Sequence, residues 1–156
     1  MNGNNPSPIR SFLFAPGNHP RKVEKVFVSG ADAVILDLED AVAISEKEGT
    51  RSKVIEAMKK NRNCLGYIRV NSLETSFCDD DISTVIGPWL DGIVLPKVED
   101  TDMLKQIDSM ISSAEVSKGL ASGIIDLMPI IETARGVENA TEIALASSRV
   151  KRIAFG

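Results

Sequence analysis

Charged side chains follow four apolar stretches of the sequence, at the point where each stretch ends. The stretches VILDLED, YIRVN, IVLPK and MPIIE carry, in that order, Asp37 with Glu39, Arg69, Lys97 and Glu132. If the stretches are neighbouring parallel strands, their carboxyl ends meet on one side of the sheet, where parallel α/β proteins bind ligands. Because aspartate and glutamate are rarely buried unless they are paired or bind a metal, the pattern predicts a polar site.

Each of these residues also has an ordinary structural explanation. Glu132 could stabilise the N-terminus of the helix that follows it. Arg69 could form a purely structural salt bridge with Asp37 or Glu39. Lys97 could be an ordinary surface lysine. The recurrence of charges at four successive strand ends nevertheless favours a functional site.

Two common kinds of site are poorly supported. The only histidine, His19, lies in the predicted loop GNHPRK, and no GxSxG-like nucleophile motif accompanies it, which argues against a Ser/Cys–His triad. The turn after the first predicted strand carries neither GxGxxG nor GxxxxGKS, so the fingerprints of nucleotide-binding proteins are missing.

Short apolar runs alternate with amphipathic stretches from Arg10 onward. Helix and strand signals predict strands at 10–15, 33–39, 66–71, 91–97, 126–132 and 150–155. They predict helices, the second with Ser45 as its N-cap, at 20–30, 45–61, within 78–87, at 101–116 and at 133–147. This alternation indicates a parallel sheet, either doubly wound or of the (β/α)₈ barrel type. The last strand, with Val150, Ile153 and Phe155, is expected to be buried.

The composition is that of an ordinary globular domain. Of the 156 residues, 43% are hydrophobic and 26% are charged, and the net charge of −4 with few aromatics argues against a nucleic-acid partner. No apolar run approaches the roughly 20 residues that span a membrane. Residues 1–9 are expected to form a flexible tail before a single domain at 10–156. Cys64 and Cys78 are expected to be free thiols, as in the cytoplasm.

Six blocks of the sequence together resemble a known family. They are RSFLFAPGNHPRKVEK, GADAVILDLEDAV, IRVNS, DGIVLPKVED, PIIETARGVENATEIA and VKRIAFG. The set is similar to the citrate lyase β-subunit-like proteins of the HpcH/HpaI aldolase superfamily, which includes malyl-CoA, citramalyl-CoA and citryl-CoA lyases. The similarity runs from about Arg10 to Gly156.

The resemblance implies a (β/α)₈ TIM barrel with a C-terminal helical extension, assembled into oligomers, here a homo-oligomer. It implies Mg²⁺-dependent cleavage of a 3-hydroxyacyl thioester to an acyl-CoA and a 2-oxo acid. The thioester substrate would be of the citryl or malyl type, carried by CoA or by an acyl carrier protein. The chemistry is a retro-Claisen cleavage, for which the sequence assigns no general base.

The resemblance also implies roles for particular residues. Arg69, in the RVN block, would bind the carboxylate of the oxo acid, since a planar guanidinium binds a carboxylate through two hydrogen bonds. Glu132, in the IET block, would bind Mg²⁺, which prefers oxygen ligands and is usually held by one or two carboxylates.

Further residues have implied roles around these two. Arg21 and Lys22 would face the phosphates of CoA. Asp37, Glu39 and Asp40 would lie near the metal and its waters, and catalytic roles are expected for Asp37 and Glu39 together with the substrate-binding arginine.

The chain departs from the family pattern at its end. In relatives, the AFG strand leads into a loop whose aspartate is the second Mg²⁺ ligand, and this sequence ends at Gly156, before it. A complete barrel typically needs about 250 residues, so we expect an incomplete barrel of about six strands and the N-terminal part of a lyase. Two alternatives stay open, a truncated non-catalytic subunit that binds CoA or a partner chain, and an aldolase that acts on free 2-oxo acids.

Overall fold

The computed structural model describes residues 8–156. Its strands are β1 (Phe12–Pro16), β2 (Ala33–Asp37), β3 (Leu65–Arg69), β4 (Gly92–Leu95), β5 (Asp126–Ile131) and β6 (Ala154–Phe155). Its helices are α1 (Pro20–Phe27), the 3₁₀ helix η1 (Ile44–Glu46), α2 (Lys47–Met58), α3 (Cys78–Val85), α4 (Thr101–Ser117), α5 (Ala134–Glu138) and α6 (Ala140–Leu145).

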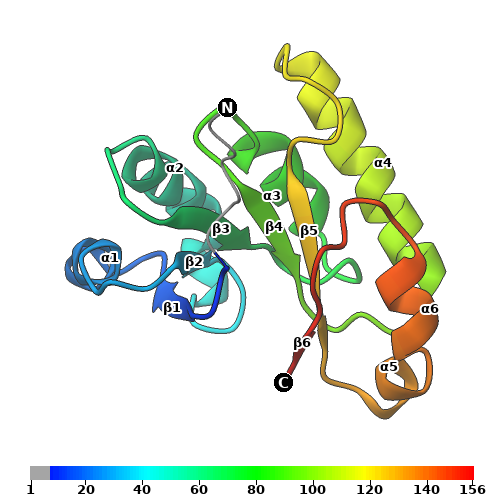
Figure 1. Ribbon diagram of the computed structural model, residues 1–156. Helices are drawn as coiled ribbons and strands as arrows, with labels where there is room; N and C mark the ends of the chain where they lie inside the picture. The colour runs from blue at the N-terminus through cyan, green and yellow to red at the C-terminus, as the bar shows by residue number, and fades with distance from the viewer. Residues whose placement is uncertain (1–7) are drawn as a thin grey trace, which may run out of the picture.

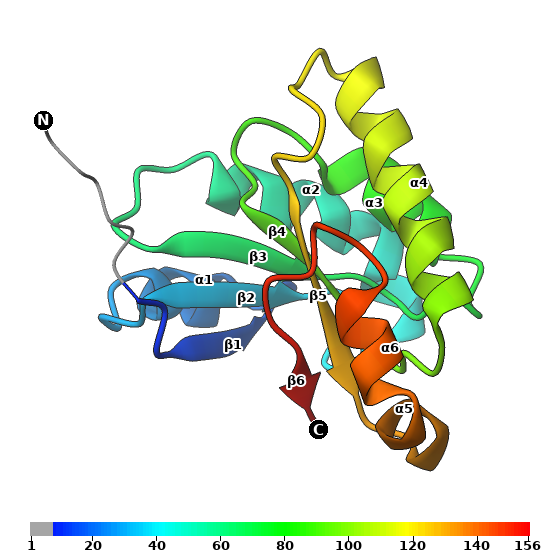
Figure 2. The ribbon, with the colours of Figure 1, turned by 45° about the vertical axis from the view of Figure 1, so that its right-hand side comes forward.

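All six strands are parallel, and each one pairs with the next strand in the sequence. A doubly wound sheet would instead reverse its strand order at a switch point. The sheet curves into a half-barrel with the helices on its outer side (Figures 1 and 2). The predicted class, an incomplete (β/α)₈ barrel with about six strands, is therefore confirmed.

The four inner strands, β2 to β5, are largely buried on both faces, as strands of a parallel sheet under helices should be. In β2, Val34 and Leu36 point outward into the main core beneath the helices. Ala33 and Ile35 point into a second cluster on the concave face, which also contains Tyr67 of β3. Side chains that alternate with period two therefore separate an outer core from an inner one.

The amino-terminal prediction falls only partly on described residues. Of the expected tail 1–9, residues 1–7 lie outside them. Ile9 is partly buried against the inner cluster.

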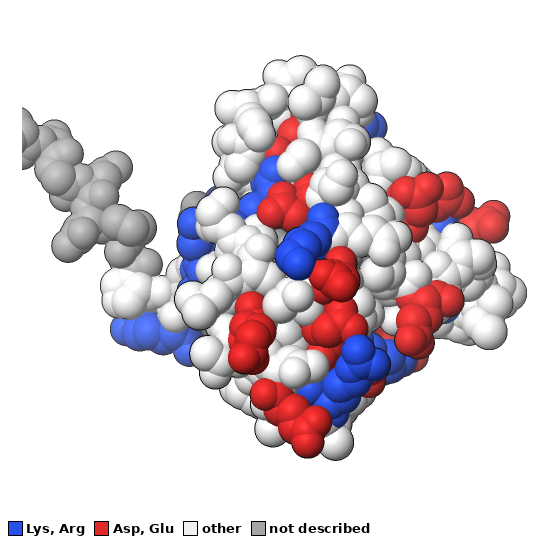
Figure 3. All heavy atoms as spheres, turned by 90° about the vertical axis from the view of Figure 1, so that its right-hand side faces the viewer, with Lys and Arg blue, Asp and Glu red and all other residues white. Residues whose placement is uncertain are grey.

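No helix in the part of the chain that the structure describes is both long enough and apolar enough to cross a membrane. On the side of the molecule where α4 lies, acidic and basic side chains are interspersed and no broad basic surface forms (Figure 3).

Three local predictions were wrong. Ser45 is not an N-cap but lies inside η1, and Glu46 precedes α2 without a side-chain cap. The helix predicted at 133–147 is interrupted at Asn139, between α5 and α6. Of the strand predicted at 150–155, only Ala154 and Phe155 form a strand, β6. Phe155 is 65% exposed rather than buried. Within the described chain β6 has a neighbour only on the β5 side, so nothing covers Phe155.

A buried ionic network holds the segment before β6 in place. Arg149 donates hydrogen bonds to both carboxylate oxygens of Glu115, at 2.8 and 2.7 Å, and one to Asp108 at 2.6 Å. Glu115 also accepts the backbone N–H groups of Gly123 and Ile125. Burial raises the pKa of Glu115, but these hydrogen bonds outweigh it and lower the pKa to about 2. The network ties α4 to the chain on both sides of β5.

Replacing Glu115 with glutamine should strongly destabilise the fold. The substitution leaves Arg149, 4% exposed, without its main anion, and breaking such a buried pair typically costs about 3–5 kcal/mol. Because the folded-state pKa is depressed, the carboxylate stabilises the fold above pH 4.5, and this stabilisation is lost as the pH falls toward 2. Urea unfolding followed by circular dichroism between pH 7 and pH 3 measures both effects.

Glu56→Gln is the matched control, because Glu56 forms an exposed pair with Lys59. Such surface pairs contribute little, so the control should unfold like the wild type at every pH. Equal stability of Glu115→Gln and wild type at pH 7 would contradict the structural role of the network.

Candidate active site

Strand register places the predicted site residues on one face of the sheet. Asp37 and Arg69 are the last residues of β2 and β3 and are paired directly across the two strands. Each lies two residues after a member of the inner cluster, Ile35 and Tyr67, so the period of two directs both side chains to the concave face. Glu132 follows Ile130 of β5 in the same way. The structure therefore brings these three sequence-predicted residues to one side of the sheet.

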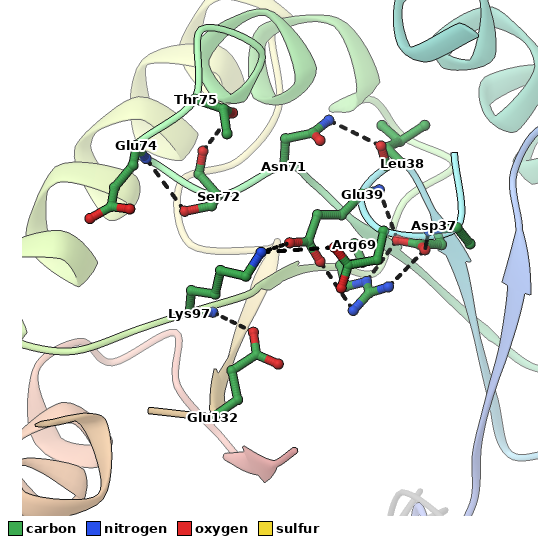
Figure 4. A network of polar contacts seen from close by, with 12 residues as sticks. Asp37, Leu38, Glu39, Arg69, Asn71, Ser72, Glu74, Thr75, Lys97 and Glu132 are labelled. Atoms are coloured by element: carbon green, nitrogen blue, oxygen red, sulfur yellow. Dashed lines mark hydrogen bonds and ion pairs between the residues drawn. The ribbon is translucent and has the colours of Figure 1, made fainter. Parts of the chain in front are cut away.

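Asp37 and Arg69 form a bidentate ion pair (Figure 4). The Nε and Nη2 atoms of Arg69 lie 2.7 Å from Oδ1 and Oδ2 of Asp37. Asp37 also accepts the backbone N–H groups of Glu39 and Ala41, both at 2.9 Å, so it holds its own following loop. Burial opposes the charge of Asp37, but these four hydrogen bonds keep its pKa below the ordinary value. The same pairing raises the pKa of Arg69 despite its burial.

Glu39 lies between two cations. It is 4% exposed, and its Oε1 accepts a hydrogen bond of 2.7 Å from the ammonium of Lys97. Its Oε2 lies 3.1 Å from Nη1 of Arg69, but the approach lacks hydrogen-bond geometry, so this contact is an ion pair only. One buried carboxylate oxygen is therefore left without a hydrogen-bond donor among the described residues.

Lys97 connects Glu39 to Glu132. Its backbone N–H donates to Oε1 of Glu132 at 2.8 Å, while its ammonium contacts Glu39 on the other side (Figure 4). The hydrogen bond to Glu39 raises the pKa of Lys97. Thr133, not Glu132, caps α5, by accepting the N–H of Gly136. We call Asp37, Glu39, Arg69, Lys97 and Glu132 the candidate-site cluster.

A buried polar network outside the cluster fixes the loop that carries Glu39. The ammonium of Lys47, which is 8% exposed, donates to the carbonyls of Leu38 and Glu39 and to Oδ1 of Asn71, at 3.0, 2.7 and 2.6 Å. Asn71 donates in turn to Leu38 and to the buried carboxylate of Asp81. Sequence reasoning did not identify Lys47, because a lysine near the start of an amphipathic helix gives no sign of burial.

Other predicted residues lie outside the cluster. Arg21 and Lys22 are exposed in the first turn of α1, which starts just after β1 ends, and neither forms an ion pair within residues 8–156. Asp40 is exposed and lies 3.8 Å from the ammonium of Lys97. His19 precedes α1 and its side chain makes no capping hydrogen bond.

The carboxylates of this cluster could supply some of the ligands of a magnesium ion, but not all of them. Within the described residues, no three His, Cys, Asp or Glu side chains are grouped closely enough to hold a metal ion. Oε1 of Glu132 is occupied by the N–H of Lys97, and its Oε2 accepts no hydrogen bond from a described residue. Since Mg²⁺ is commonly held by one or two carboxylates and keeps several waters, Glu132 fits one position of such a shell.

Comparison with known proteins identifies the family of this site. The profile of the HpcH/HpaI aldolase/citrate lyase family matches residues 10–156. The citrate lyase subunit beta of Leuconostoc mesenteroides subsp. cremoris is 40% identical, over 97% of this chain and 51% of the relative. The L-malyl-CoA/beta-methylmalyl-CoA lyase of Cereibacter sphaeroides is 35% identical, over 96% of this chain and 48% of the relative.

Solved structures give the same result. The citrate lyase beta subunit of Mycobacterium tuberculosis, complexed with oxaloacetate and magnesium, is 27% identical and superposes with a TM-score of 0.71, over 93% of this chain and 56% of that one. CitE from the same organism, in complex with magnesium, acetoacetate and coenzyme A, is 27% identical with a TM-score of 0.67, over 92% of this chain and 46% of that one.

The sequential parallel half-barrel with charged residues at its carboxyl ends defines an α/β protein of the TIM-barrel type. The chain belongs to the HpcH/HpaI aldolase/citrate lyase family, as its resemblance predicted. The curated relatives named above are lyases. The chain spans about half the length of the curated relatives it matches.

Replacing Lys47 with methionine should loosen the Glu39 loop. Methionine fills a similar volume but removes the donor that the carbonyls of Leu38 and Glu39 share with Oδ1 of Asn71. The two carbonyls keep one donor each, and Oδ1 of Asn71 is left with none. Since an unsatisfied buried polar group costs about 1–3 kcal/mol, we expect a loss of at least about 1 kcal/mol. Hydrogen exchange of the amides of residues 38–42 should accelerate.

Lys53→Met is the control, since Lys53 lies on the exposed face of the same helix α2. It should change neither the unfolding free energy nor the exchange of residues 38–42. If Lys47→Met also leaves that exchange unchanged, Lys47 does not hold the loop.

Proposed function

We propose that the protein is part of a Mg²⁺-dependent carbon–carbon lyase that cleaves a 3-hydroxyacyl thioester of the citryl-CoA or malyl-CoA type. The products are an acyl-CoA and a 2-oxo acid. The observation that carries the proposal is a partly buried arginine, Arg69, held by an ion pair on the same face as a glutamate, Glu132, that keeps a carboxylate oxygen free of hydrogen bonds from described residues. The named relatives, lyases of citrate and of malyl-CoA or methylmalyl-CoA, support it.

Arg69 retains an edge for a substrate carboxylate. Asp37 occupies its Nε and one hydrogen of Nη2, and Oε2 of Glu39 lies 3.1 Å from Nη1 without hydrogen-bond geometry. The remaining N–H groups of Nη1 and Nη2 therefore form no hydrogen bond with a described residue. The guanidinium carbon lies 5.2 Å from the ring centroid of Phe14, whose ring supports the guanidinium plane. A guanidinium held on one edge loses little entropy when its other edge binds the carboxylate of a 2-oxo acid.

The residues of the chain would act as follows. Arg69 binds and orients the carboxylate of the oxo-acid portion, and Asp37 fixes the plane of its guanidinium. Glu132 would hold Mg²⁺, which supplies Lewis-acid stabilisation of the hydroxyl or oxo oxygen. In the retro-Claisen reaction the 3-hydroxyl loses its proton, the adjacent C–C bond breaks, and its electron pair forms the thioester enolate, which is then protonated. Asp37 is a poor base, because its pKa is lowered.

We further propose that Arg21 and Lys22 contact the phosphates of CoA. Both are exposed cations at the start of α1, on the side of the sheet where the strands end. The structure of a CitE protein with coenzyme A supports a CoA ester as the substrate class.

A cytoplasmic location fits Cys64 and Cys78, which are unpaired in the structure. The proposal extends to a homo-oligomer, as the family resemblance implies.

Replacing Glu132 with glutamine should reduce Mg²⁺-dependent release of CoA from malyl-CoA or citryl-CoA by at least about 100-fold. Glutamine preserves the hydrogen bond from Lys97 but removes the negative charge that a magnesium ion requires. Free CoA is measured with a thiol reagent, using the polypeptide as its source organism makes it. Glu138→Gln, an exposed glutamate on the neighbouring helix α5, should retain wild-type activity.

The same assay separates the competing functions. CoA binding without turnover would indicate a non-catalytic subunit, and cleavage of free 2-oxo acid adducts independent of CoA would indicate an aldolase. The intact mass of the native polypeptide, compared with 16.8 kDa for this chain, shows whether one polypeptide supplies further ligands. Near-normal activity of Glu132→Gln would contradict its assignment to the metal.

A further inference from the structure

Lys97 has an unusual backbone conformation. It is the only non-glycine residue within residues 8–156 with a positive φ, at 55°. Side chains disfavour this left-handed region, which is uncommon for any residue other than glycine, asparagine or aspartate. Strained conformations of this kind persist where the surrounding structure holds them, and they concentrate at functional sites. The conformation is therefore a reason to ask what Lys97 contributes.

The left-handed turn lets one residue contact two carboxylates with two different groups. The peptide N–H of Lys97 reaches Oε1 of Glu132 at 2.8 Å. The ammonium, at the other end of the side chain, reaches Oε1 of Glu39 at 2.7 Å. Glu39 follows β2 and Glu132 follows β5, so Lys97 joins opposite parts of the half-barrel (Figure 4).

The two contacts differ in charge. Glu39 receives an ammonium and, at 3.1 Å, the guanidinium of Arg69, so its negative charge is compensated by two cations. Glu132 receives a neutral amide N–H and forms no salt bridge with a described residue. A neutral donor fixes the orientation of the carboxylate without cancelling its charge. Glu132 therefore keeps its attraction for a cation, whereas Glu39 does not.

We propose that Lys97 is a positioning residue that assigns different roles to two neighbouring glutamates. Its ammonium keeps Glu39 away from a divalent cation, and its peptide N–H holds Glu132 ready to bind one. This inference deepens, and rests on, the proposed Mg²⁺-dependent function. It explains why a lysine occupies a left-handed position that glycine would adopt without strain.

The test is the affinity of Lys97→Met for Mn²⁺, measured by calorimetry and by the free-ion EPR signal, in the polypeptide as its source makes it. Removing a positive charge close to a cation site and releasing Glu39 should tighten Mn²⁺ binding by at least about fivefold. The kcat for thioester cleavage should fall at least about tenfold, because Glu39 is no longer held by its ammonium partner. If Lys97 had only a structural role, Lys97→Met would instead weaken Mn²⁺ binding as well as lower kcat.

Two further variants distinguish the effect of the side-chain charge from the effect of the backbone conformation. Lys97→Arg retains the charge and should keep Mn²⁺ affinity within about twofold of wild type. Lys97→Gly removes the charge but adopts positive φ freely. It should therefore bind Mn²⁺ as tightly as Lys97→Met does, and without metal it should have a higher melting temperature than Lys97→Met. Lys105→Met, which removes an exposed lysine of α4, should change nothing.

Unchanged or weaker Mn²⁺ binding in both Lys97→Met and Lys97→Gly would overturn the role of Lys97. The proposed function fails separately, if wild type binds Mn²⁺ but cleaves no thioester; the Mn²⁺ affinities of the variants then still decide the role of Lys97. If wild type binds no Mn²⁺, both proposals fall.

Discussion

The in-register pairing of β2 with β3 is the constraint on which the site depends. It places Asp37 directly opposite Arg69 at the ends of two buried strands. A slip of one residue would turn one of the two side chains to the helical face, into an apolar core that has no partner for it. The pair also anchors the loop after β2, because Asp37 accepts two of the backbone N–H groups of that loop. The position of Glu39 is thus a consequence of strand register.

In the candidate-site cluster, negative and positive side chains alternate. Moving across the sheet, the side chains are Asp37, Arg69, Glu39, Lys97 and Glu132, each in contact with the next. Three carboxylates against two cations leave a surplus of one negative charge, and it falls on the terminal member, which has only a neutral donor. The end of β6 lies beside this residue, since a Cβ at Gly156 would be 3.1 Å from Oε2 of Glu132. The uncompensated charge therefore lies beside the end of β6.

The sequence was sufficient to predict the sheet and to predict that several candidate-site residues share one face of it. Buried strands such as 33–37 carry runs of β-branched and aliphatic residues, and their polar ends identified Asp37, Arg69 and Glu132. The contacts of Lys97 with both Glu39 and Glu132 could not be predicted, because they depend on a positive φ. Nothing in the sequence indicates a positive φ at a lysine. Lys47 was missed because its partners are largely backbone carbonyls from another element. The length of β6 was overestimated because apolar residues suggest a strand even where few pairing partners exist.

Sequential strand order also has a consequence for how the chain reaches this structure. Each strand pairs with the strand before it, so adding a strand closes a loop of little more than one helix and costs little chain entropy. A chain emerging from the ribosome could therefore add its strand–helix units in order. Some contacts skip strands: Nζ of Lys97 donates to Glu39, 58 residues earlier, and Nη1 of Arg152 donates to the hydroxyl of Tyr67, 85 residues earlier. β6 therefore docks onto an existing sheet, and the residue after it, Gly156, comes to lie beside Glu132.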